Sequence, residues 1–85
     1  MQPSDAKSGQ VVRVIHLTPM PGILASPEHL EGRQVGMIGQ VKSLTFLSDY
    51  DEQEPCIVWV LHQGKVAPYW NYELALVGVP YPNLM

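Results

Sequence analysis

The sequence is poor in charged residues. Only 15% of its 85 residues are charged, against about 25% in ordinary domains, while 46% are hydrophobic. A small domain has a high ratio of surface to volume, so part of its surface must here be apolar or uncharged. Contiguous apolar surface often marks an interaction site. The composition therefore favours a single small domain that docks onto something else.

Basic residues are especially few, and they are not clustered. The formal net charge is −3, and the five basic residues stand one by one along the chain. Affinity for a nucleic-acid backbone comes from clustered Lys and Arg side chains. The pattern therefore argues against nucleic acid as a partner. The five residues are Lys7, Arg13, Arg33, Lys42 and Lys65.

Cysteine and long apolar runs are almost absent. Cys56 is the single cysteine, so no disulfide framework within the chain is available. No run approaches the roughly 18 apolar residues that a membrane span needs, and the first ten residues are polar and small, unlike a secretory signal. An unpaired cysteine without a signal fits a reducing compartment. We expect a cytoplasmic protein that does not span a membrane.

Short β-branched and aromatic segments predict an all-β fold. A polar arm over residues 1–9, expected to be disordered, and a Pro-rich apolar tail over 78–85 flank a single domain over 10–77. The segment 56–63 is apolar on both faces and predicts a central strand, while Pro68 limits the segment after it to an edge or a bulge. The expected strands cover residues 10–17, 35–47, 56–63, 65–70 and 75–77.

The connecting residues refine this prediction. Gly36 and Gly39 interrupt the longest strand and predict a bend or a close backbone approach. Gln63-Gly64 predicts a tight hairpin, and residues 71–74 predict one 3₁₀ turn. Ser26 is a candidate N-cap for one helical turn that Gly32 ends. About five antiparallel strands with a 3₁₀ turn before the last one indicate a small SH3-like barrel; an OB-like barrel is the alternative.

Two segments are candidates for partner binding. The loop 18–27 carries three prolines and its own apolar side chains, and long loops in small domains are often functional. Aromatic residues cluster between positions 69 and 72, and Tyr and Trp are favoured interface anchors. Trp59 is expected in the core, and Trp70 is either a contact residue or a plug at the end of the barrel. The predicted contact residues are Met20, Ile23, Leu24, Tyr69, Trp70 and Tyr72.

Catalytic and metal-binding patterns are weak. His16, His29 and His62 lie on separate elements and form none of the short-spaced ligand pairs of zinc sites. Cys56 begins an apolar strand, where a cysteine is usually a buried, unreactive side chain. Glu73 is expected to accept backbone N–H groups in the turn before the last strand, or to pair with Lys65 or Arg33 at the surface. We expect no catalytic residue, no metal and no cofactor.

An acidic run lies between the expected strands 35–47 and 56–63. Its carboxylates lack the glycine and the closing glutamate at the spacing of a calcium-binding EF-hand loop. A solvated loop is expected, and a contact to a basic partner is the alternative. The run contains Asp49, Asp51, Glu52 and Glu54.

Several of these motifs occur in one known family. Pro27-Glu28-His29 precedes Gly36-x-x-Gly39-x-Val41, a Pro55-led strand follows, and Lys65-Val66 leads to Glu73-Leu74 and Val77. This layout resembles the SH3-like variable chain of ferredoxin–thioredoxin reductase. The resemblance implies a non-catalytic accessory subunit that packs against a catalytic partner and holds no cluster of its own. The Gly-x-x-Gly-x-Val element also resembles KOW-type barrels.

These observations lead to one functional expectation with three alternatives. We expect an accessory or adaptor domain that docks onto a protein partner in a hetero-complex, with a redox or photosynthetic electron-transfer assembly as the implied setting. The alternatives are a KOW-like barrel on RNA or the ribosome, a small redox protein that uses Cys56, and a homodimer through the same low-charge surface.

Overall fold

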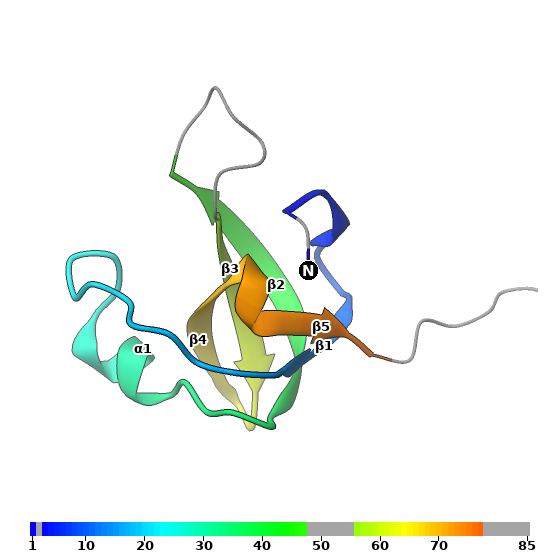
Figure 1. The fold of residues 1–85 in the computed structure, drawn as a ribbon. Helices are drawn as coiled ribbons and strands as arrows, with labels where there is room; N and C mark the ends of the chain where they lie inside the picture. The colour runs from blue at the N-terminus through cyan, green and yellow to red at the C-terminus, as the bar shows by residue number, and fades with distance from the viewer. Residues whose placement is uncertain (2, 48–55, 78–85) are drawn as a thin grey trace, which may run out of the picture.

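The fold is a five-stranded antiparallel sheet with very little helix (Figure 1). The computed structural model describes residues 1, 3–47 and 56–77. The expected 3₁₀ turn lies directly before the last strand, so the prediction of an all-β fold of about five strands is confirmed. The elements are η1 Pro3–Asp5, β1 Val11–Val14, α1 Pro27–Glu31, β2 Ile38–Phe46, β3 Cys56–His62, β4 Lys65–Trp70, η2 Asn71–Glu73 and β5 Leu74–Leu76.

The strands follow the order β4-β3-β2-β1-β5 in the sheet. β3 pairs on both sides, as the doubly apolar sequence predicted, and β4 lies at one edge, where Pro68 is tolerated. β1 pairs with β2 and with β5, which forms the other edge. The chain therefore brings its first and last strands together in the sheet.

β2 is the long, curved strand of Figure 1, and its glycines have different roles. Gly39 packs closely against β3: a Cβ there would lie 2.5 Å from the Leu61 carbonyl oxygen. Gly36 has a φ of +86° and lies in the turn before the strand, because the strand begins at Ile38 rather than at residue 35. The pairing register shifts just after Val41, which adds to the bend.

The β3–β4 hairpin turns at Gln63 and Gly64, as expected. Their φ values are +53° and +76°, the left-handed pair that a two-residue hairpin requires. β4 then runs from Lys65 to Trp70, in agreement with the expected range. β5 lies one residue earlier than expected, because Leu74 already pairs with Val14 of β1.

The core lies on the inner face of the sheet. Alternate residues of each strand point inward, in keeping with the period of two along a strand. Met37 and Leu44 pack against this cluster from positions that are only partly buried. The cluster consists of Ala6, Val12, Val14, Val41, Cys56, Val58, Val60, Ala67, Tyr69 and Leu74.

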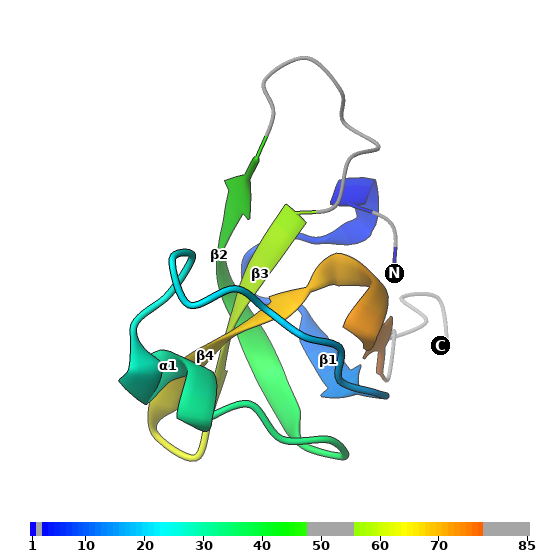
Figure 2. The same cartoon turned by 60° about the vertical axis from the view of Figure 1, so that its left-hand side comes forward.

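A second buried layer lies on the outer face of β3 and β4. Ile57 and Trp70 are register partners on these strands and are only 1% and 8% exposed, yet they lie outside the core cluster. Figure 2 shows the chain after β1 crossing in front of β3 and β4 before it enters α1. The long loop therefore covers this face of the sheet with its own residues.

The helical turn forms as the sequence predicted. The Ser26 hydroxyl oxygen accepts the backbone N–H of His29, Pro27 occupies the first turn and Gly32 is the C-cap. None of the residues of α1 is buried. The C-terminal end of α1 contacts β4, where a Cβ on Gly32 would lie 3.5 Å from the Ala67 side chain.

The N-terminal residues differ from the prediction of a disordered arm over 1–9. Residues 3–5 form a 3₁₀ turn, and the Ala6 side chain is 7% exposed within the core cluster. The Asn71 side-chain amide donates to the Met1 carbonyl oxygen, and the Gly9 N–H donates to the Val41 carbonyl oxygen. Non-local hydrogen bonds order a segment whose polar composition predicted no structure. The expected tail over 78–85 lies outside the described residues.

No helix among the described residues has the length and apolar character to cross a membrane.

Candidate functional site

A row of stacked rings lies at the end of β4. The Trp70 and Tyr72 rings are 6.2 Å apart and nearly parallel, and the His16 ring also stacks with Tyr72, at 6.3 Å. Tyr72 is 41% exposed, whereas Trp70 is buried. Of the aromatic residues predicted between positions 69 and 72, Tyr72 is therefore the one that presents its ring to the surface.

Tyr69 does not belong to the contact surface, which corrects the prediction. Its side chain is wholly buried because residue 69 points inward opposite Val58. Its hydroxyl accepts the Gln34 N–H at 2.9 Å and lies 2.9 Å from His62 Nε2. Burial raises the pKa of Tyr69. Tyr69 fastens the segment after α1 to the core instead of meeting a partner.

The loop 18–27 folds back on the aromatic row. The Trp70 indole N–H donates to the Pro19 carbonyl oxygen at 3.1 Å. Met20 and Leu24 are partly buried, while Ile23 is 93% exposed. The predicted contact residues thus separate into two groups. Trp70, Met20 and Leu24 are wholly or partly covered in this chain, and Ile23 and Tyr72 are the exposed members.

Glu73 is the anchor for this loop. Its carboxylate is fully buried and accepts the backbone N–H of Trp70 at 2.8 Å. The same carboxylate accepts from the Arg33 guanidinium and from the backbone N–H and hydroxyl of Thr18. Arg33 also donates to the Thr18 carbonyl oxygen. One side chain therefore holds both ends of the connection between β1 and β2.

The Glu73 network corrects one expectation and confirms another. Glu73 accepts a backbone N–H in the turn and pairs with Arg33, as the sequence suggested. The pair is not at the surface, because the two side chains are 9% and 0% exposed. Thr18 extends the network to the surface, since its hydroxyl lies 3.2 Å from the Tyr72 hydroxyl. The network therefore positions the exposed ring as well as the loop.

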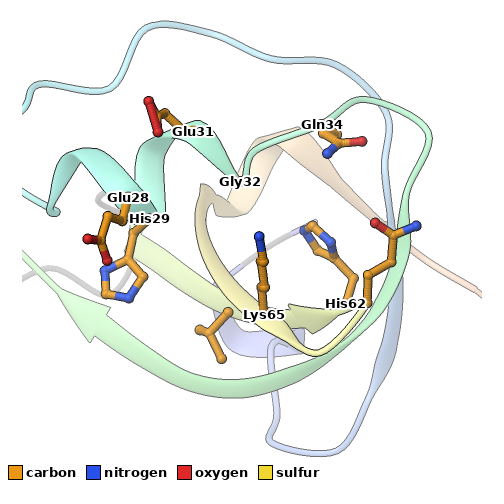
Figure 3. A pocket seen from close by; sticks show the side chains of 9 residues that line it. Glu28, His29, Glu31, Gly32, Gln34, His62 and Lys65 are labelled. Atoms are coloured by element: carbon orange, nitrogen blue, oxygen red, sulfur yellow. The ribbon is translucent and has the colours of Figure 1, made fainter.

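A pocket of about 560 Å³ lies between α1 and the β3–β4 hairpin. Figure 3 shows α1 and the segment after it on one side, with His62 and Lys65 on the other. The helix side carries two carboxylates and the hairpin side one ammonium. The lining residues are Glu28, His29, Glu31, Gly32, Gln34, His62, Gln63, Lys65 and Val66.

His62 is the buried polar group of this pocket. It is 6% exposed, and burial lowers its pKa. Nε2 contacts the Tyr69 hydroxyl, whereas Nδ1 is buried without a hydrogen-bond partner. The Tyr69 hydroxyl already accepts from Gln34, so it is free to donate to Nε2 and leave the proton of neutral His62 on Nδ1. The His62 ring therefore has a structural role, and its Nδ1–H is a hydrogen-bond donor without a partner.

Trp59 differs from its expected place in the core. It is partly buried on the outer face, where its indole N–H donates to the Thr45 hydroxyl at 2.9 Å. The His29 ring meets it edge-on at 5.4 Å between ring centres. Trp59 thus belongs to the layer on the outer face of β3 and β4, and it contacts α1 through His29.

The remaining chemistry-bearing residues are dispersed. Cys56 is fully buried, and burial raises the pKa of its thiol, which lowers the thiolate fraction at neutral pH. Within residues 3–47 and 56–77, no three His, Cys, Asp or Glu side chains are grouped so that they could hold a metal ion. The acidic run at 49–54 lies outside the described residues.

Sequence reasoning missed Arg33, Thr18 and His62 as members of buried networks. Arg33 lies between Gly32 and Gln34, and nothing local marks it as buried, whereas His62 ends an apolar strand in phase with the inward residues Val58 and Val60. One signal was present: Glu73 lies between apolar residues in a segment predicted to pack, and a buried carboxylate requires a cation and hydrogen-bond donors.

Comparison with protein-family models, with curated proteins and with solved structures found no match to this chain. The fold and the surface define a small all-β domain with stacked rings and exposed apolar side chains.

Proposed function

We propose that the protein is a non-catalytic accessory domain of SH3-like type that docks onto a protein partner. The exposure of large apolar side chains carries this proposal. Ten such residues are at least 37% exposed on the described surface of a small domain with few charges. These residues are Val11, Ile15, Leu17, Ile23, Val35, Ile38, Phe46, Leu47, Tyr72 and Leu76.

The state of the reactive groups supports the same proposal. Cys56 is inaccessible and has a raised pKa, the reverse of what a redox or nucleophilic cysteine needs. Glu73 is held by four hydrogen bonds within the chain, and His62 contacts a buried tyrosine. The residues best suited to chemistry therefore serve the fold.

The geometry near Trp70 favours a preformed docking surface. The exposed Tyr72 ring stacks with Trp70 and His16, and its hydroxyl contacts Thr18, so little side-chain entropy is lost when the ring is covered. Tyr is also a frequent anchor of protein interfaces. An accessory subunit of an electron-transfer assembly is the setting that the sequence resemblance implies.

Photo-crosslinking in the organism's own cells tests the proposal. A photoreactive residue replaces Tyr72, Ile23 or Ile38 in turn, and Glu28, exposed on α1, is the matched control position. We expect one and the same protein to be crosslinked from at least one apolar position and not from position 28. Crosslinks to RNA alone would favour the KOW-like alternative, and a folded chain without any adduct would overturn the proposal.

A further inference from the structure

One face of the sheet is left uncovered by the described part of the chain. Along β1, Val12 and Val14 point into the core, while Val11 and Arg13 point outward. Ile15 continues the outward row and is 49% exposed. The loop that covers the outer face of β3 and β4 leaves this row of β1 open to solvent.

The pairing register places Arg13 among apolar side chains, with the exposed Gln40 on the same face opposite Val11. Arg13 lies opposite Ile38 of β2 and opposite Ala75 of β5, so the three side chains share one face. Val11 lies two residues before Arg13 on β1, Ile15 lies two residues after it, just beyond the end of the strand, and Ile38 is 48% exposed. We refer to Val11, Arg13, Ile15, Ile38 and Ala75 together as the Arg13 face.

The charge of this region has one sign. β1, β2 and β5 contain the basic residues Arg13 and Lys42 and no acidic residue. Arg13 forms no ion pair with a described residue. Asp5, in η1, is exposed two residues before Lys7 and outside the sheet.

We propose that the Arg13 face binds a segment of a protein partner that presents apolar side chains around a carboxylate. The inference rests on the proposed docking function and assigns it a surface. Val11, Ile15 and Ile38 would be covered by apolar groups, and Arg13 would gain an anion that no described residue supplies. A bidentate Arg–carboxylate contact fixes orientation as well as charge.

Charge complementarity favours this occupant over a second copy of the chain. A two-fold dimer through this face would bring each Arg13 toward the other, and like charges oppose association. An acidic apolar segment meets both features of the surface.

Two-dimensional NMR of the full chain tests the proposal with two peptide probes. In one peptide Leu alternates with Glu, and in the other Lys replaces every Glu. We expect the Glu peptide to shift the amide signals of Val11, Arg13, Ile15 and Ile38. Arg13→Glu should weaken this binding at least about tenfold and create binding of the Lys peptide. Lys65→Glu, the same charge reversal on the distant edge strand, should leave both affinities unchanged.

Four results of the NMR experiment would overturn the inference. The first is that the Glu peptide does not shift the amide signals of the Arg13 face, and the second is that Lys65→Glu weakens peptide binding as much as Arg13→Glu does. The third is that anionic lipid vesicles shift these signals but neither peptide does. The fourth is that the signals of the Arg13 face shift with protein concentration in the absence of any probe. The last would identify a second copy as the occupant. A partner crosslinked at Tyr72 but absent from this face would also overturn the inference, while the docking function itself would stand.

Discussion

Arg33 and Glu73 are forty positions apart in the sequence and form a buried ion pair with 2.5 Å between nitrogen and oxygen. The pair joins the segment after α1 to the turn before β5. Because the same carboxylate also binds Thr18, the pair closes the long β1–β2 connection at both ends. The loop thus has a defined position although it contains only one helical turn.

Glu73→Gln should destabilise the protein by about 3–5 kcal/mol, because it leaves the Arg33 charge buried without its counter-ion. Urea unfolding followed by tryptophan fluorescence measures this loss. Glu31→Gln removes an exposed carboxylate from α1 and should change the free energy of unfolding by less than about 0.5 kcal/mol.

A double-mutant cycle separates the pair from other effects of the substitution. Arg33→Met combined with Glu73→Gln should cost less than the sum of the two single changes, since neither charge then remains buried alone. Strict additivity would show that the two side chains are not coupled.

Gly39→Ala should destabilise the fold by about 1–3 kcal/mol through overpacking. The added Cβ would lie 2.5 Å from the Leu61 carbonyl oxygen and 2.6 Å from a Val60 methyl carbon. Gly22→Ala is the control, because a Cβ there meets nothing within 4 Å. Thermal unfolding of both variants by circular dichroism distinguishes them. Equal melting temperatures would contradict the close approach of β2 and β3.

His62 should make stability fall on acidification. Burial lowers its pKa in the folded state, so the unfolded chain binds more protons below the ordinary value of about 6.5. Its contribution is therefore complete above about pH 6.5 and is lost as the pH falls toward the lowered value. The slope for one proton is at most about 1.4 kcal/mol per pH unit. Lys65 is the strand partner of His62 across the hairpin, and it supplies no negative charge that would stabilise a protonated His62.

Unfolding measured at a series of pH values checks this assignment. His62→Gln keeps a group able to hydrogen-bond Tyr69 and should flatten the curve in this window. A His62→Gln curve identical to wild type would show that another group controls the acid transition.

Cys56 should resist thiol reagents in the folded protein. Its side chain has no exposed surface, and the raised pKa keeps the thiol protonated at neutral pH. Labelling with a disulfide reagent should proceed at the rate of unfolding or local opening, and a Ser43→Cys/Cys56→Ala variant should react far faster at its exposed position. Fast labelling of Cys56 in folded wild type would instead support the redox alternative.

Local patterns predicted most strands and turns of this fold. The apolar segment 56–63, the Gln63-Gly64 turn and the Ser26 cap each act through neighbours in the chain, and each was found at or within one residue of its expected place. The bounds of β1 and β2 were overestimated, because β1 covers only Val11–Val14 and β2 only Ile38–Phe46.

Burial of the aromatic residues was not predictable in the same way. Tyr69 and Tyr72 lie three residues apart in one polar-aromatic segment, yet one is wholly buried and the other 41% exposed. Tyr69 points inward on β4 opposite Val58, whereas Tyr72 lies in η2 after the strand has ended, and their hydroxyl groups contact Gln34 and Thr18 from distant parts of the chain. The expected disordered arm failed for the same reason, because Ala6 enters a core built by other elements.

The sequence by itself determined the all-β class, the hairpin, the close backbone approach at Gly39 and the low charge of the surface, since these depend on backbone preference and composition. Only the tertiary structure decided that Glu73 and Arg33 are buried together, that the loop covers one sheet face and that the Arg13 face stays open. Burial and pairing depend on which segments meet across the sheet, and the chemistry of a single segment does not specify its distant neighbours.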